Sequence, residues 1–187
     1  MTALTAYQEK RDKAVMVLIK ETIPAKVLNL DSRIQDFDST GWNDADQFTY
    51  IRESLLPEIR QYQTILYDLC IFLKRRTPKM EDGHNSGVDI IKAVGLEISK
   101  FETRMSELHN GLADVFWGSG VTHAKSTKHA TSEDYKRRYL LLGENRTSLI
   151  PFNLKEVRDA YEMSFDLMSK NLDVILCPRK TQSSSMY

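Results

Sequence analysis

The residues best suited to metal chemistry lie in one short polar stretch, KMEDGHNSGV, at positions 79–88. Glu81 and His84 form a Glu-x-x-His pair there, and no other glutamate in the chain has a histidine at that spacing. Helical bundles hold a di-iron centre with two such pairs that project inward from helices. A single pair in a connector that contains glycine does not supply that arrangement. The sequence therefore argues against a di-iron site.

The same stretch also resembles the beginning of a calcium-binding loop. Such a loop needs acidic or amide ligands at its third and fifth positions and a bidentate glutamate at its twelfth. Counted from Asp82, these positions hold His84, Ser86 and Ala93. Calcium is therefore rejected, and we expect no metal and no cofactor.

Motifs of catalysis are absent from the rest of the sequence. It contains no GxGxxG or P-loop phosphate motif, no GxSxG and no HExxH. His109, His123 and His129 have no cysteine or histidine partner at ligand spacing, which favours ordinary surface or helix histidines. We expect that the protein is not an enzyme.

The charge balance indicates no strong attraction to nucleic acid or to an anionic membrane, because 26 basic residues face 26 acidic ones. The basic clusters at 74–76 and 136–138 are short, so solvated helix ends are the simpler interpretation. The sequence has no apolar run of about 18 residues and no apolar signal core at its beginning. We expect no nucleic-acid partner and no membrane partner. We expect the protein to be located in the cytoplasm and/or nucleus, with reduced thiols at Cys70 and Cys177.

Four long segments with helical periodicity must position this polar stretch. We expect helices at about residues 5–35, 46–76, 88–126 and 132–177. The apolar residues of the last three repeat at spacings of three and four, which is typical of one continuous buried face. The second helix has on this face Phe48, Ile51, Leu55, Ile59, Tyr62, Leu66, Leu69 and Leu73. The third helix has Ile91, Val94, Ile98, Phe101, Met105, Leu108, Leu112 and Val115, and the fourth has Val157, Tyr161, Phe165, Met168, Leu172 and Ile175.

The first segment shows a weaker stripe, formed by Leu18, Thr22, Ala25, Leu28 and Ile34. Apolar residues off the main stripe of the second segment indicate either lateral contacts in an oligomer or thick packing within one subunit: Leu56, Ile65, Cys70 and Phe72. Four long helices with short connections predict an all-α, up-down four-helix bundle.

Prolines and glycines mark the expected irregularities of these helices. Pro24 and Pro57 should kink the first two, because proline lacks an amide donor and clashes with the preceding turn. Pro151 should bend or interrupt the fourth helix, and Pro178 should stop it. Glycines at 118 and 120 either end the third helix or weaken it. The predicted organisation is a bundle over residues 1–178, a connector at 77–87 and a tail at 179–187.

Several segments, in order and spacing along the whole chain, are similar to those of one family. The polar connector resembles the activation loop of the 11S regulator (REG) family of proteasome activators. The other matching segments are IPAKVLNLDS at 23–32, PEIR at 57–60, EDYKR at 133–137, KNL at 170–172 with Pro178-Arg179, and the final Tyr187.

The resemblance implies a heptameric ring of four-helix subunits, formed by copies of this one chain, that activates the 20S proteasome without ATP. It implies that tails with Ser185, Met186 and Tyr187 bind between the proteasome's α subunits, with the Tyr187 carboxylate as anchor. It further implies that the loop residues press the gate open: Glu81, Asp82, Gly83, His84, Asn85, Ser86 and Gly87. A helical scaffold or adaptor without proteasome activity is the alternative, and a bundle enzyme with a buried metal is weaker still.

Overall fold

The computed structural model describes residues 2–80 and 85–179, and these are mostly helical, with no strand among them. Their contacts form two compact units. Unit 1 comprises Met1–Val27, Thr64–Glu102 and Ala160–Tyr187, and unit 2 comprises Leu28–Gln63 and Thr103–Asp159. Each unit therefore contains a part of all four helical segments that the sequence predicts.

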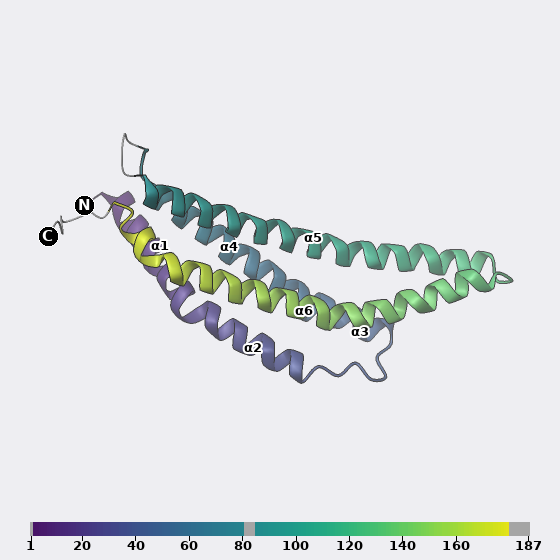
Figure 1. The fold of residues 1–187 in the computed structure, drawn as a ribbon. Coiled ribbons are helices and arrows are strands. Elements are labelled where there is room, and N and C mark those ends of the chain that lie inside the picture. The colour runs from purple at the N-terminus through teal and green to yellow at the C-terminus, as the bar shows by residue number, and fades with distance from the viewer. Residues whose placement is uncertain (1, 81–84, 180–187) are drawn as a thin grey trace. The chain divides into compact units, whose positions relative to one another are not determined.

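The helices follow one another in four segments. The first is α1 (Ala3–Val17), the π-helix η1 (Leu18–Thr22) and α2 (Ile23–Gln35), and the second is α3 (Asp44–Tyr50), the π-helix η2 (Ile51–Leu55) and α4 (Leu56–Arg76). The third and fourth are the single helices α5 (Ser86–Lys128) and α6 (Glu133–Leu176). Within each unit, consecutive segments run in opposite directions (Figure 1). This confirms the predicted up-down arrangement of four helices.

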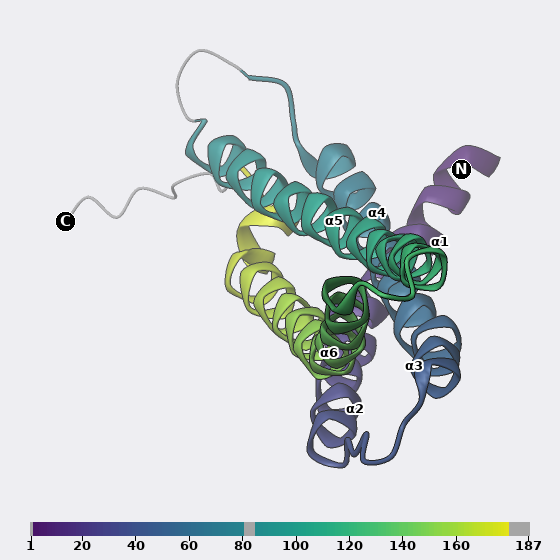
Figure 2. The same ribbon diagram turned by 90° about the vertical axis from the view of Figure 1, so that its right-hand side faces the viewer.

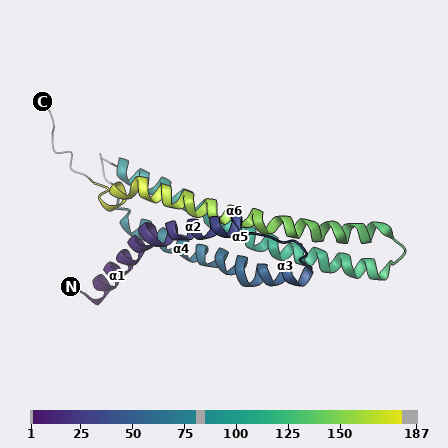
Figure 3. The same cartoon turned by 90° about the horizontal axis from the view of Figure 1, so that it is seen from below.

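Each π-helix ends two residues before a proline, Pro24 after η1 and Pro57 after η2. The residue before each proline donates its backbone amide to the carbonyl five residues earlier. Ile23 donates to Leu18, and Leu56 donates to Ile51. A π turn of this kind widens the helix and commonly accompanies a bend. Figure 3 shows such a bend between α1 and the beginning of α2. The expected kinks therefore take the form of wide turns.

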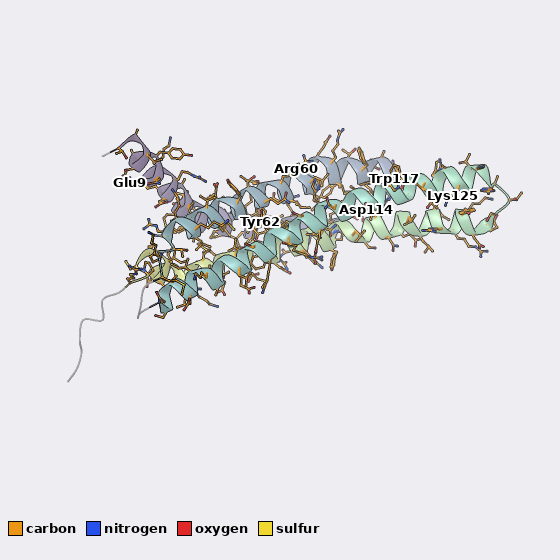
Figure 4. The ribbon with its side chains drawn as sticks, turned by 90° about the horizontal axis from the view of Figure 1, so that it is seen from above. Glu9, Arg60, Tyr62, Asp114, Trp117 and Lys125 are labelled. Carbon is orange, nitrogen blue, oxygen red and sulfur yellow. The ribbon has the colours of Figure 1, made fainter. Side chains whose placement is uncertain are left out.

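The cores of both units are built from the predicted stripes. Tyr62, labelled in Figure 4, has no exposed surface. The buried residues of unit 1 include Leu66, Leu69, Leu73, Ile91, Val94, Ile98, Tyr161, Met168 and Ile175, and those of unit 2 include Ile51, Leu55, Ile59, Tyr62, Met105, Leu108, Leu112 and Val157. Phe48 and Phe165 depart from the prediction, with 45% and 36% of their surface exposed.

The stripe predicted for the first segment is wrong. Leu28 is 73% exposed, whereas Val15, Ile19, Ile23 and Leu30 are buried. This segment carries apolar residues on several sides, and the wide turn of η1 shifts the phase of the helix between them. Spacing alone therefore does not identify the buried side.

The apolar residues off the main stripe of the second segment mostly serve packing within the chain. Ile65, Cys70 and Phe72 are 4%, 9% and 0% exposed. Of the two alternatives that the sequence left open, thick intramolecular packing therefore accounts for these three positions. None of the helices in the described part of the chain combines the length and apolarity needed to span a membrane.

Helices α5 and α6 continue through the positions where breaks were expected. In α5, Ser119 and Thr122 are buried, and the Thr122 hydroxyl donates to the Gly118 carbonyl at 2.8 Å. In α6, Pro151 lies inside the helix, between Ile150 and the fully buried Leu154. Of the two outcomes expected at Pro151, a bend or an interruption, the interruption does not occur, because tertiary packing on both sides of the proline outweighs its local cost.

The loop between α2 and α3 belongs to unit 2 and can be followed in Figure 2. Phe37, Trp42 and Tyr50 form an aromatic cluster whose ring centroids lie 5.2–5.6 Å apart. Asn43 and Asp46 then form a capping box, each side chain accepting the other residue's backbone amide. These contacts begin α3 two residues before the predicted start.

Candidate functional site

The connector between α4 and α5 begins at a well-defined helix end. The amide and the hydroxyl of Thr77 both donate to the carbonyl of Leu73, at 3.0 and 2.8 Å. Pro78 follows, and a proline cannot extend the hydrogen-bonding pattern of a helix. The last turn of α4 carries Lys74, Arg75 and Arg76, and cations are favoured at this end of a helix.

Only part of the predicted activation loop belongs to the described residues. Glu81, Asp82, Gly83 and His84 lie outside them, as do the tail residues Ser185, Met186 and Tyr187. On the near side of this gap, the Lys92 ammonium lies 3.0 Å from the Met80 sulfur.

The remaining loop residues, Asn85, Ser86 and Gly87, form the beginning of α5. The Asn85 carbonyl accepts a hydrogen bond from the Asp89 amide at 3.0 Å, which makes Asn85 the residue that opens the helix. The helix itself starts at Ser86, two residues earlier than predicted. Ser86 and Gly87 are therefore helical, and the predicted connector at 77–87 ends too late.

Gly87 approaches the base of the tail more closely than any side chain would permit. A Cβ atom added to Gly87 would lie 3.0 Å from the Pro178 carbonyl carbon and 3.1 Å from its Cα, and closer still to its oxygen. The backbone of Gly87 does not have a positive φ angle, because Gly41 is the one described residue that has one. Glycine is required at position 87 by close backbone contact.

A second contact joins the tail base to the other end of the connector. The guanidinium of Arg179 donates to the backbone carbonyl of Lys79. We call these two contacts, Gly87 with Pro178 and Arg179 with Lys79, the tail clasp. Both belong to unit 1, and together they link the residues on either side of the connector to the residues directly after α6.

Helix α1 is tied to the end of α4 by a group of ion pairs. Asp12 accepts hydrogen bonds from Arg75 and Arg76, the latter at 2.7 Å. Arg11 pairs with Asp68 at 2.5 Å. The interpretation of the cluster at 74–76 as merely solvated is therefore wrong for its two arginines, which hold the N-terminal helix against α4.

Unit 2 contains a polar cluster that connects α3 with α6. The Asp44 carboxylate accepts from the Tyr139 hydroxyl at 2.7 Å and from the Arg146 guanidinium at 2.5 Å. The Tyr139 hydrogen bond is the main reason that the pKa of Asp44 lies below its usual range, and Arg146 acts in the same direction. The Arg146 guanidinium also lies over the Phe116 ring, 5.6 Å from its centroid. We call these groups the Asp44 cluster.

The described residues offer little for catalysis. No group of three histidine, cysteine, aspartate or glutamate side chains among them lies close enough together to hold a metal. A surface pocket of about 490 Å³ lies between α4 and α5 of unit 1, lined by Cys70, Leu73, Ile91, Leu96 and neighbouring residues. Burial raises the pKa of the Cys70 thiol, which keeps it protonated and a poor nucleophile. His123 and His129 pack against Tyr139 and Tyr135.

Exposed apolar side chains are a further property of the surface. Trp117, on the C-terminal half of α5, is 76% exposed (Figure 4). Nothing in the sequence singles out Trp117 or the tail clasp, because both depend on where a helix face or a distant segment lies in space.

Comparison with known sequences gives a consistent result. The sequence model of the family described as "Proteasome activator PA28, C-terminal" matches residues 41–185. The protein "Proteasome activator 28" of Dictyostelium discoideum is 27% identical over 110 residues, which cover 59% of this chain and 49% of that protein. "Proteasome activator complex subunit 3" of Homo sapiens is 25% identical over 145 residues, which cover 75% and 56%. The chain thus aligns with about half the length of these relatives.

A solved structure also resembles the fold. The 11S subunit of the Plasmodium falciparum proteasome, PA28, superposes with a TM-score of 0.85 and 17% sequence identity. The superposition covers 94% of this chain and 93% of that one. The helical fold is therefore shared nearly from end to end.

Proposed function

The chain belongs to the PA28 proteasome activator family, and from this premise we propose that it is a subunit of an ATP-independent activator of the 20S proteasome. The observation that carries the proposal is the family match over residues 41–185, which spans the connector, α5, α6 and most of the tail. In this proposal the protein is a regulator without catalysis of its own. It works in the cytoplasm, the nucleus or both.

The proposed assembly is a ring, a homo-heptamer, in which four-helix subunits stand side by side. The tail, with Ser185, Met186 and Tyr187, binds the α subunits of the proteasome, and the loop from Glu81 to Gly87 opens the gate. The tail clasp supports this division of work, because it brings the base of the tail to the connector within unit 1. Both proposed working parts therefore leave the same end of that unit.

Multivalency supplies the binding strength in this proposal. A single short tail binds weakly, because its ordering costs conformational entropy. Once one tail of a ring is bound, the others bind in an effectively intramolecular reaction, which raises the overall affinity by about 10² to 10⁴. A ring is therefore essential to the function.

The deciding experiment is a peptidase assay with a matched latent 20S proteasome and small fluorogenic peptides. The purified protein should sediment as one species of several subunits and should accelerate hydrolysis. A variant that lacks Met186 and Tyr187 should sediment identically and neither bind nor accelerate. If the intact protein sediments as a single subunit and leaves hydrolysis unchanged, the scaffold or adaptor alternative replaces the activator.

Substitution in the loop separates binding from gate opening. Gly83→Trp and Asn85→Trp should preserve binding to the proteasome but abolish stimulation, because a bulky side chain changes the surface that meets the gate. Asn110→Trp is the control, since Asn110 is exposed on α5 far along the chain from the loop. Normal stimulation by both loop variants would show that the loop is assigned wrongly.

A further inference from the structure

The tail clasp connects three chain segments: the residues after α4, the first turn of α5 and the residues after α6. In the proposed function these segments belong to two separate parts, the activation loop and the tail. Lys79 lies three residues after the end of α4, Gly87 lies in the first turn of α5, and Pro178 and Arg179 lie directly after α6. The contacts between them are Gly87 against Pro178, and the hydrogen bond from Arg179 to the Lys79 carbonyl.

We propose that Gly87 and Arg179 are positioning residues that fasten the base of the tail to both ends of the connector, so that the tail base at Pro178 and Arg179 moves together with these two ends. This inference rests on the proposed function, because it concerns how tail binding is transmitted to the gate. It adds to that function a mechanical link within each subunit.

The Gly87 side of the clasp is rigid because it joins backbone to backbone. Pro178 has a fixed φ angle and follows Cys177, whose amide still donates to the Asp173 carbonyl at 3.0 Å as part of the α6 pattern. Gly87 is equally fixed within α5. Close-packed atoms transmit displacement rather than absorb it, so a push on the tail base reaches the first turn of α5 directly.

The Arg179 side of the clasp resists displacement in the opposite direction. Its guanidinium donates to the backbone carbonyl of Lys79 and not to a group on the lysine side chain. A pull on the tail therefore acts directly on the backbone at Lys79. Lys79 is itself separated from α4 by Thr77 and Pro78 alone, and Thr77 is bonded to the last turn of that helix. The connector is thus held at its two ends by the same short piece of tail.

The test uses Gly87→Ala and Arg179→Ala in the full chain. A Cβ at position 87 must displace Pro178 by about 1 Å to reach ordinary contact distance, and the arginine variant removes the other contact. Gly95→Ala and Arg137→Ala are the matched controls. Gly95 lies in the same helix with nothing within 4 Å of an added Cβ, and Arg137 is exposed on α6.

At saturating concentrations on the latent proteasome, both clasp variants should still bind, as measured by native electrophoresis. Their stimulation of peptide hydrolysis should fall at least about fivefold, the lower end of usual coupling between two sites. The two controls should stimulate like the unmodified protein. Stimulation by both clasp variants at the level of the controls would overturn the inference.

A second measurement needs no proteasome. Cys177 is exposed and adjoins Pro178, whereas Cys70 is buried, so a nitroxide can be attached at Cys177. Its electron paramagnetic resonance spectrum should show faster motion in both clasp variants than in either control. Unchanged motion would refute the clasp itself. If the motion changes but the unmodified protein never stimulates a proteasome, the proposed function fails while the clasp stands.

Discussion

Replacing Asp44 with alanine should lower the free energy of unfolding by about 2–3 kcal/mol at pH 7. Its carboxylate accepts from Arg146, whose side chain is only 5% exposed, and a hydrogen bond to a charged group contributes about 1.5–3 kcal/mol. The Asp44 side chain is 48% exposed, which favours the lower figure because water screens the charge. The Tyr139 hydroxyl adds about 0.5–1 kcal/mol. The position of Asp44 in the first turn of α3 adds about 0.3–0.5 kcal/mol.

The pH dependence of this difference has a definite sign. The pKa of Asp44 is lowered in the folded state, first by the Tyr139 hydrogen bond and then by Arg146. The stabilisation is therefore complete above the unfolded pKa and is lost as the pH falls through the folded one. The stability gap between the unmodified protein and Asp44→Ala should be constant from pH 8 to about pH 5. It should then narrow steadily towards pH 3.

The assay is urea unfolding at one fixed protein concentration, because association with partner subunits would change the apparent stability. Tyr139→Phe isolates the hydroxyl contribution and should cost about 0.5–1 kcal/mol. Asp134→Ala removes an exposed carboxylate from the first turn of α6 and should cost at most about 0.5 kcal/mol. If Asp44→Ala costs no more than Asp134→Ala, the cluster contributes nothing beyond the helix dipole and the reasoning fails.

Three further substitutions test other parts of the fold. Asp12→Ala releases two arginines and should accelerate amide hydrogen exchange throughout α1, whereas Glu9→Ala should not; equal exchange in both would contradict the anchoring of α1. Gly95→Ala should raise stability by about 0.5–1 kcal/mol in urea unfolding, because alanine is the better helix former and nothing obstructs its Cβ; a loss would disprove the open space. Leu66→Ala should lower the free energy of unfolding by about 2–5 kcal/mol, because Leu66 is fully buried. Leu96→Ala, at a position that is 61% exposed, should lower it by less than about 0.5 kcal/mol. Similar losses in the two variants would disprove the assigned core.

The sequence predicted the helices and most of the core because helical periodicity reports burial directly. The residues of the seam from Ile51 to Leu73 follow one another at spacings of three or four, and every one of them is buried. The first segment failed because its apolar residues surround the helix, so that Leu28 and Leu30 are equally plausible from spacing. Only the neighbouring helices decide between them.

The family was predicted correctly from short segments spread over the whole chain, and the sequence model of the family confirms it. The tail clasp was out of reach, because Gly87 and Pro178 lie 91 positions apart and their contact involves backbone atoms only. A glycine in a polar stretch predicts conformational freedom more readily than close contact. Here the requirement for glycine is set by a distant segment.

The two π-helices have a consequence for insertions and deletions. In an α-helix, removing one residue rotates every later side chain by about 100° around the axis, which would turn a buried seam towards solvent. A π turn already contains one surplus residue. Loss of a residue from Leu18–Thr22 or Ile51–Leu55 would therefore leave the rest of the helix facing as before, with a local clash at the following proline as the main penalty. At these two places the chain length can change while the faces of the helix are kept.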